Sequence, residues 1–243
     1  MWDREADVLA TRHHVVRYDQ RGFGRSPDTA ADYFAHADLL SVMDATGVGR
    51  AVLVGASNGG RAVLDAAVSA PERVVGLVLV GSILPGAPSS ADLDAVFEDE
   101  ETALRVGDIA RAREINLRLW VDGVGRDAGL ASTAVRRSVG TWLDALLPRQ
   151  ATQLLTAAGQ ARTLDPPTAD RLGQIIAPAL IVVGQHDQPS MRMTALRLAF
   201  GIHRSRLVVV EHAAHLVNLE QPQQFDDALG AFLDDVSGTP AGA

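Results

Sequence analysis

The sequence predicts an α/β fold in which a mostly parallel sheet carries helices on both faces. Short, continuous apolar runs rich in β-branched residues alternate with stretches of helical spacing, up to about residue 84 and again after residue 174. Strands that are covered on both faces read as continuous apolar runs, and helical connections make neighbouring strands parallel. A third observation indicates where a functional site would lie: one apolar run ends at Ser57, between two glycines.

Composition limits the class of protein. The chain has 243 residues, 47% of them hydrophobic, with no cysteine and a formal net charge of −8. This length fits one large domain or a domain with an insertion. The lack of cysteine excludes disulfides and thiolate metal sites, and the negative charge argues against nucleic acid or an anionic membrane as the main partner.

The sequence also bears on location. No apolar run approaches the ~20 residues that cross a bilayer. Asp3, Glu5 and Asp7 stand where a signal peptide would need an apolar stretch. We therefore expect a cytoplasmic protein without a membrane partner.

The elements before the serine follow in order. Residues 4–11 have the pattern of a helix, and Val15 to Asp19 has the pattern of a buried strand. A loop rich in Gly, Ser and Pro covers residues 20–27. Helical spacing over residues 31–46, with Gly47 as a C-terminal stop, predicts the next helix.

The segment around Ser57 predicts a strand, a sharp turn and a helix. Ala51 to Val54 is the strand, and the helix continues to Pro71. Glycine at positions 55 and 59 is expected to relieve a clash at the tight turn, because glycine has no Cβ. The motif Gly-x-Ser-x-Gly also occurs by chance in ordinary turns. A phosphate loop is a poor fit, since no Gly-Lys-Ser/Thr follows.

After a further buried strand at Val74 to Val80, the alternation of strands and helices stops. Residues 85–173 contain no convincing strand and carry helical patterns with Trp120 and Trp142. We therefore expect two parts, a core formed by residues 1–84 and 174–243 and a helical cap formed by residues 85–173.

Alternation resumes with a strand at residues 179–183, a helix at 190–200, a strand at 206–210 and a helix from Pro222. Asp187 follows the first of these strands, and His212 and His215 follow the second. Ligands of parallel α/β sheets bind at the carboxyl ends of the strands. A serine nucleophile needs a base and an orienting acid, and this pattern supplies both.

Four segments together resemble the α/β-hydrolase fold superfamily, in particular its enol-lactonase and small-molecule esterase members. The chain order of Ser57, Asp187 and His215 is similar to that of the family's catalytic groups. The matching segments cover nearly the whole chain apart from the expected cap: Tyr18–Ser26, Gly55–Gly60, Gly184–Asp187 and Ala214–Pro222.

The resemblance implies a role for each residue. Ser57 would be the nucleophile, His215 rather than His212 the general base, and Asp187 the group that orients the base. The backbone amide of Asn58 would stabilise an oxyanion. Trp120 and Trp142 would line the pocket beneath the cap or, more often for such residues, belong to the core of the cap. No cofactor or metal is implied, and the partner would be a small-molecule substrate.

The beginning of the chain departs from the family pattern. Relatives carry further strands before the loop at Asp19, and one of these strands ends in a His-Gly loop that supplies a second oxyanion amide. Three explanations are open: a start site further upstream, a sheet closed by pairing Val15–Asp19 with Ala51–Gly55, or a non-catalytic relative. We favour the first, because the expected triad is intact.

The sequence therefore predicts hydrolysis of a small ester or lactone through a serine acyl-enzyme. Hydrolysis of a carbon–carbon bond in a diketone-like substrate and cofactor-free haloperoxidase chemistry are alternatives for the same residues. A ligand-binding protein without catalysis is the alternative from another class, favoured by the missing oxyanion loop.

Overall fold

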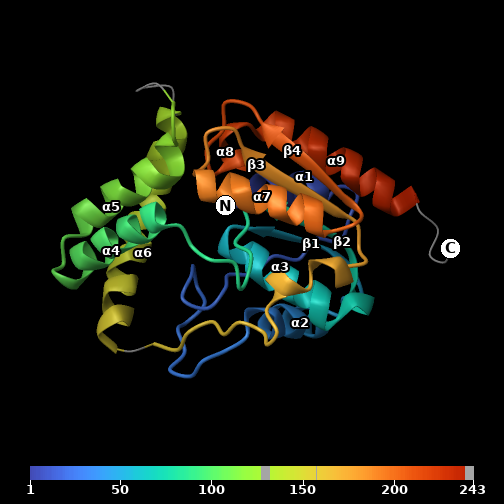
Figure 1. Ribbon diagram of the computed structural model, residues 1–243, viewed down its shortest axis with the longest axis horizontal. Coiled ribbons are helices and arrows are strands. Elements are labelled where there is room, and N and C mark those ends of the chain that lie inside the picture. Colours follow the sequence, from blue (N-terminus) through green and yellow to red (C-terminus); the bar gives the residue numbers. More distant parts are fainter. Residues whose placement is uncertain (127–131, 157, 239–243) are drawn as a thin grey trace.

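A four-stranded parallel sheet forms the centre of the computed structural model, which describes residues 1–126, 132–156 and 158–238 (Figure 1). The strands lie side by side in chain order. The predicted α/β class with a parallel sheet is confirmed. The strands are β1 (Ala51–Ala56), β2 (Val74–Val80), β3 (Ala179–Gly184) and β4 (Ser205–Val210).

Alternate residues of the inner strands supply two separate apolar layers, because successive side chains of a strand point to opposite faces. Leu77 and Leu79 of β2 belong to one layer, and Val78 and Val80 belong to the other. Each layer packs against its own helices, so β2 and β3 are covered on both faces. This burial explains why their sequences are continuous apolar runs.

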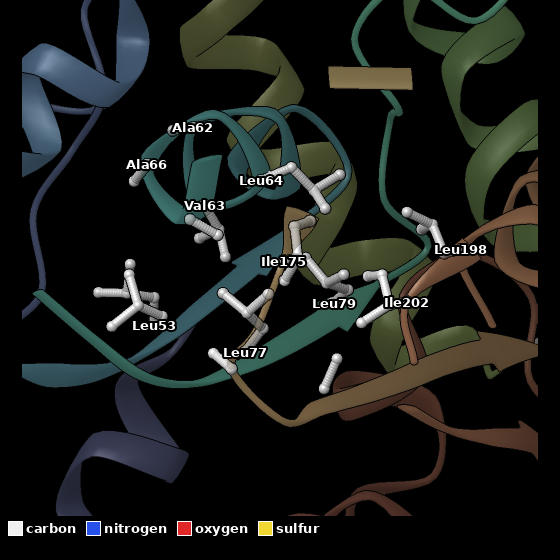
Figure 2. Close-up of a cluster of buried hydrophobic side chains, with 14 of the residues drawn as sticks. Leu53, Ala62, Val63, Leu64, Ala66, Leu77, Leu79, Ile175, Leu198 and Ile202 are labelled. Atoms are coloured by element: carbon white, nitrogen blue, oxygen red, sulfur yellow. The ribbon is translucent and has the colours of Figure 1, made fainter. Parts of the chain in front are cut away.

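The first face of the sheet is covered by three helices. They are α2 (Ala35–Ala45), α3 (Asn58–Ser69) and α7 (Pro189–Gly201). Figure 2 shows Val63 and Leu64 of α3 above Leu77 and Leu79 of β2. The opposite face packs against α1 (Asp3–Leu9) and α9 (Pro222–Gly238), which contribute Leu9, Phe225 and Phe232 among others.

Between β2 and β3 the chain forms a group of helices beside the sheet (Figure 1). Two of them begin at side-chain caps: Ser90 accepts a hydrogen bond from the Leu93 amide, and Asp108 accepts one from the Arg111 amide. The group has a small apolar core of its own, which also contacts Leu216 and Leu219. Its helices are α4 (Ala91–Arg105), α5 (Ile109–Leu117), a π-helix (Arg118–Asp122) and α6 (Thr133–Thr156).

Short elements complete the chain. Single 3₁₀ turns lie at Pro71–Arg73, Thr168–Asp170 and Leu172–Gln174. Helix α8 (Val217–Glu220) follows β4. Within the described ranges, no helix is both long enough and apolar enough to span a bilayer. The parts of the expected cap at 127–131 and 157, and of the expected core at 239–243, lie outside the described residues.

The prediction of a strand at Val15 to Asp19 is wrong. The segment is irregular, Val16 is exposed, and no backbone hydrogen bond joins the segment to β1 in the described structure. The same finding contradicts closure of the sheet by direct pairing of these two segments. The apolar run here is only two residues long, and polar or charged residues flank it, so burial gives little reason for the segment to join the sheet.

The helix expected to begin near residue 31 begins instead at Ala35. Tyr33 forms an isolated parallel bridge with Ala161, and Phe34 has an extended backbone. This pairing uses the residues before the helix. It also attaches the segment that follows α6 to the core.

Candidate active site

Ser57 occupies the turn between β1 and α3 in a strained conformation. Its φ of 49° and ψ of −117° place a residue other than glycine in a region that side chains rarely adopt. Such strain persists only where neighbours hold it, and it gathers at functional sites. Here the Ser57 amide donates to the carbonyl oxygen of Val80 at 2.9 Å, and the Ser57 carbonyl accepts from the Ile83 amide at 3.1 Å.

The two glycines of the motif differ in importance. A Cβ on Gly55 would lie 2.5 Å from the carbonyl oxygen of Gly59, so only glycine fits at this position. A Cβ on Gly59 would meet only the Gln20 amide nitrogen, at 4.0 Å, which is an ordinary contact. The expected clash is therefore present at Gly55 and absent at Gly59.

The backbone N–H of Asn58 is the first in helix α3. Its N–H has no partner among the described residues, as expected at a helix N-terminus. The helix dipole makes this end favourable for negative charge. The Asn58 side chain donates to the Gln20 side-chain oxygen at 3.1 Å, which ties the turn to the loop after residue 19.

Asp187 and His215 form a buried pair at the carboxyl ends of β3 and β4. Nδ1 of His215 lies 2.9 Å and 3.1 Å from the two carboxylate oxygens of Asp187. The side chains are almost fully enclosed, and Asp187 also accepts a hydrogen bond from the Gln188 amide at 2.7 Å. A proton on Nδ1 satisfies the carboxylate and leaves Nε2 free to accept a proton. His212 is exposed and makes no hydrogen bond with Asp187 in the described structure.

Gly81 lies between the turn that carries Ser57 and the side chain of His215. It follows Val80, the partner of the Ser57 amide, and has a φ of +48°. A Cβ at Gly81 would lie 2.9 Å from Cε1 of His215 and 3.1 Å from an Asp187 oxygen. No hydrogen bond joins the Ser57 hydroxyl to His215 in the described structure, and such contacts are often long without substrate.

Sequence reasoning missed Gly81. The signal that could have found it was a glycine immediately after the strand that ends at Val80. A glycine at the carboxyl end of a strand often marks a turn or a close approach of another group.

Of the two tryptophans proposed for the pocket, one lies at the site. The centroid of the Trp120 ring is 4.3 Å from that of the His215 imidazole, and Phe97 packs 6.2 Å from Trp120. The Trp120 carbonyl also accepts a hydrogen bond from the His215 amide at 3.3 Å. Trp142 lies on α6 with 41% of its surface exposed, and it makes no ring contact with the site in the described part of the chain.

A cavity of about 510 Å³ lies beside Asn58, between the loop over residues 21–29 and helices α4 and α6. Arg21 and Arg61 face it from the core, and Glu100 and Glu101 face it from α4. Burial raises the pKa of Glu100, whose carboxylate accepts a 2.6 Å hydrogen bond from Asn116. The cavity suits a polar small molecule. In the described ranges, no three acidic or histidine side chains are grouped to hold a metal.

Comparison with known proteins identifies the family of the chain. Residues 1–228 match the alpha/beta hydrolase family. The chain belongs to this family. A curated relative, the "putative carbamate hydrolase RutD" of Variovorax paradoxus, is 31% identical and aligns with 96% of this chain and 87% of its own length.

Two further similarities are informative. The pimeloyl-[acyl-carrier protein] methyl ester esterase of Nitrosomonas europaea is 29% identical over 93% of this chain and 87% of its own length. The crystal structure of the enol-lactonase from Burkholderia xenovorans has a TM-score of 0.77 over 96% of this chain and 85% of that one, at 22% identity, a likeness of fold. This α/β-hydrolase is therefore an enzyme of the hydrolase class, as the sequence predicted.

Proposed function

We propose that this α/β-hydrolase cleaves a small ester or lactone through a covalent acyl-enzyme. Ser57 is the nucleophile, His215 the general base and Asp187 the group that orients His215. The buried 2.9 Å contact between His215 and Asp187 is the observation that carries the proposal. An imidazole held by a buried carboxylate, beside a strained serine, is the arrangement that activates a hydroxyl group.

The residues act in two half-reactions. Nε2 of His215 takes the Ser57 proton as the hydroxyl oxygen bonds to the substrate carbonyl carbon, and the carbonyl oxygen becomes an oxyanion near the Asn58 N–H. The carbon–oxygen bond to the leaving alcohol then breaks, and the alcohol takes the proton from His215. A water molecule next loses a proton to His215 and attacks the acyl carbon. The bond from that carbon to the Ser57 oxygen breaks, Ser57 takes the proton back from His215, and the acid is released.

Residues 85–173 serve in this proposal as a cap over the site. The packing of Trp120 against His215 supports this role, because the helical region then covers one side of the imidazole. The cavity beside Asn58 would receive the part of the substrate that carries polar groups. Trp142 has no contact that supports a role in substrate binding.

The proposal is tested by steady-state hydrolysis. We would compare p-nitrophenyl acetate, p-nitrophenyl butyrate, γ-butyrolactone and a vinylogous diketone that only carbon–carbon cleavage can consume. Turnover of an ester or lactone that is lost in Ser57→Ala supports the proposal. Turnover of the diketone alone would favour the carbon–carbon alternative, and binding without turnover would favour the ligand-binding alternative.

A further inference from the structure

One short segment crosses both loops that carry the proposed acid and base. We call residues 118–126 the strap: it consists of the π-helix Arg118–Asp122 and the chain up to Arg126. π-Helical turns are rare and often mark functional sites. The strap contains Trp120, whose ring lies against His215.

The strap is hydrogen-bonded to the loop of Asp187. The Val124 amide donates to the His186 carbonyl at 2.8 Å, and the Gln188 side chain donates to the Leu119 carbonyl at 2.9 Å. Gly123 permits this close approach, since a Cβ there would lie 2.7 Å from the His186 carbonyl oxygen. The acid loop is thus held from both sides of Asp187.

Arg126 connects the strap to the loop of His215. Its guanidinium group donates at 2.7 Å to the His212 carbonyl and at 2.7 Å to the Glu220 carboxylate. Both charged side chains are only 3% exposed. The other Glu220 oxygen accepts a hydrogen bond from the Ala214 amide at 3.0 Å, directly before His215.

The two contacts of Arg126 lie at opposite ends of the histidine loop. His212 has a φ of 59°, a left-handed conformation in which residues other than glycine are uncommon. Glu220 is the last residue of α8. One guanidinium group therefore joins His212, at the start of the loop after β4, to Glu220, at its end. His215 lies between these two residues.

We propose that Arg126 and Glu220 are positioning residues for His215. They fix the loop so that Nδ1 stays on Asp187 and Nε2 faces Ser57. The inference rests on the proposed function, because it assigns the pair to the alignment of that base. It also means that the strap and the two loops move as one unit, so that displacement of the strap would disturb the base.

The test measures two properties of Arg126→Met. The first is the rate at which a fluorophosphonate probe labels Ser57, which should fall about 10- to 100-fold, as expected when a reacting group is displaced by about 1 Å. The second is the NMR signal of the His215 Nδ1 proton, which should broaden or move away from its hydrogen-bonded position. Arg126→Lys should restore part of both properties, because a lysine keeps the positive charge beside Glu220 but lacks the fork of donors that reaches both acceptors.

Arg118→Gln is the matched control. Arg118 lies in the same strap, but its ion pair with Glu114 is exposed, so both properties should remain those of the wild type. If Arg126→Met does not fold, the double variant Arg126→Met with Glu220→Gln replaces it. That variant leaves no buried unpaired charge and keeps an acceptor for the Ala214 amide.

Two outcomes separate this inference from the proposed function. A folded Arg126 variant with the wild-type labelling rate and the wild-type Nδ1 signal would overturn the positioning role. A wild-type protein that is not labelled would overturn the proposed function. The Nδ1 signal would then still decide whether the pair holds His215 against Asp187.

Discussion

The indole ring of Trp120 packs on the imidazole of His215, with centroids 4.3 Å apart and planes inclined at 37°. Trp120 belongs to the helical region, and His215 belongs to the loop after β4. This contact excludes water from one side of the imidazole and limits its rotation. Aromatic pairs of this kind contribute about 0.5–1.5 kcal/mol beyond the area that they bury.

Trp120→Ala should therefore lower kcat for ester hydrolysis by about 2- to 10-fold, which corresponds to that energy. Trp120→Phe should keep most of the activity, because a ring remains against His215. Trp142→Ala is the control, since Trp142 is exposed on α6 and should tolerate the change. Equal kcat values for Trp120→Ala and the wild type would show that the ring contact does not assist the base.

Gly81→Ala should abolish most activity and destabilise the fold. The added Cβ would lie 2.9 Å from His215, and the residue would keep a φ of +48°. Gly47→Ala provides the control, because Gly47 also has a positive φ but has no atom within 4 Å of its Cβ position. Strain of this kind costs about 1–3 kcal/mol. We expect both variants to lose thermal stability and Gly81→Ala alone to lose its rate of labelling.

Asp187→Asn should lower kcat by about 10⁴-fold with little change in KM. An amide in place of the carboxylate stabilises the wrong tautomer of His215 and cannot offset its positive charge. Ester hydrolysis measured against substrate concentration separates the two constants. A variant that kept more than about a tenth of the wild-type kcat would remove Asp187 from the proposed triad.

Asp65→Asn should change how stability depends on pH. Asp65 is buried on α3, and its carboxylate accepts a 2.6 Å hydrogen bond from Thr168. Burial raises its pKa above the ordinary value, despite nearby His36, Arg61 and Arg171. The folded chain then binds more protons at this site than the unfolded chain, so stability falls as pH rises from the ordinary carboxyl pKa through the raised one.

The asparagine variant has no titrating carboxyl group at this position, so it lacks this dependence of stability on pH. Its amide oxygen can still accept the hydrogen bond from the Thr168 hydroxyl. Relative to the wild type, it should gain stability as pH rises from 4 to 7. Urea unfolding at several pH values measures the difference. A constant difference across this range would contradict a raised pKa for Asp65 in the folded protein.

The sequence was informative wherever burial controls the pattern. The continuous apolar runs of β2 and β3 predicted their strands, because both faces of these strands are covered. Helix α9 was predicted from one apolar face and from Pro222 at its start. At Val15 to Asp19 the pattern misled, since two apolar residues do not show whether a neighbouring strand is present.

The sequence also predicted which strand ends would carry Ser57, Asp187 and His215, because carboxyl ends of parallel strands share one edge. It could not predict the contacts that come from the helical region. Trp120 lies on a π-helical turn that has no sequence signature, and Arg126 follows this turn. The partners of both residues are about 90 residues away along the chain. The need for glycine at position 81 could not be predicted either, because it arises from the close approach of His215, which lies on another loop.

Covalent labelling by a fluorophosphonate, with the modified residue mapped by mass spectrometry, is the most direct test of the proposed catalytic triad. We expect one adduct, on Ser57, that is lost in His215→Ala and strongly reduced in Asp187→Asn. His212→Ala should be labelled like the wild type. A folded protein that remains unlabelled, or an adduct on Ser57 that persists at the same rate without His215, would contradict the proposed catalytic site.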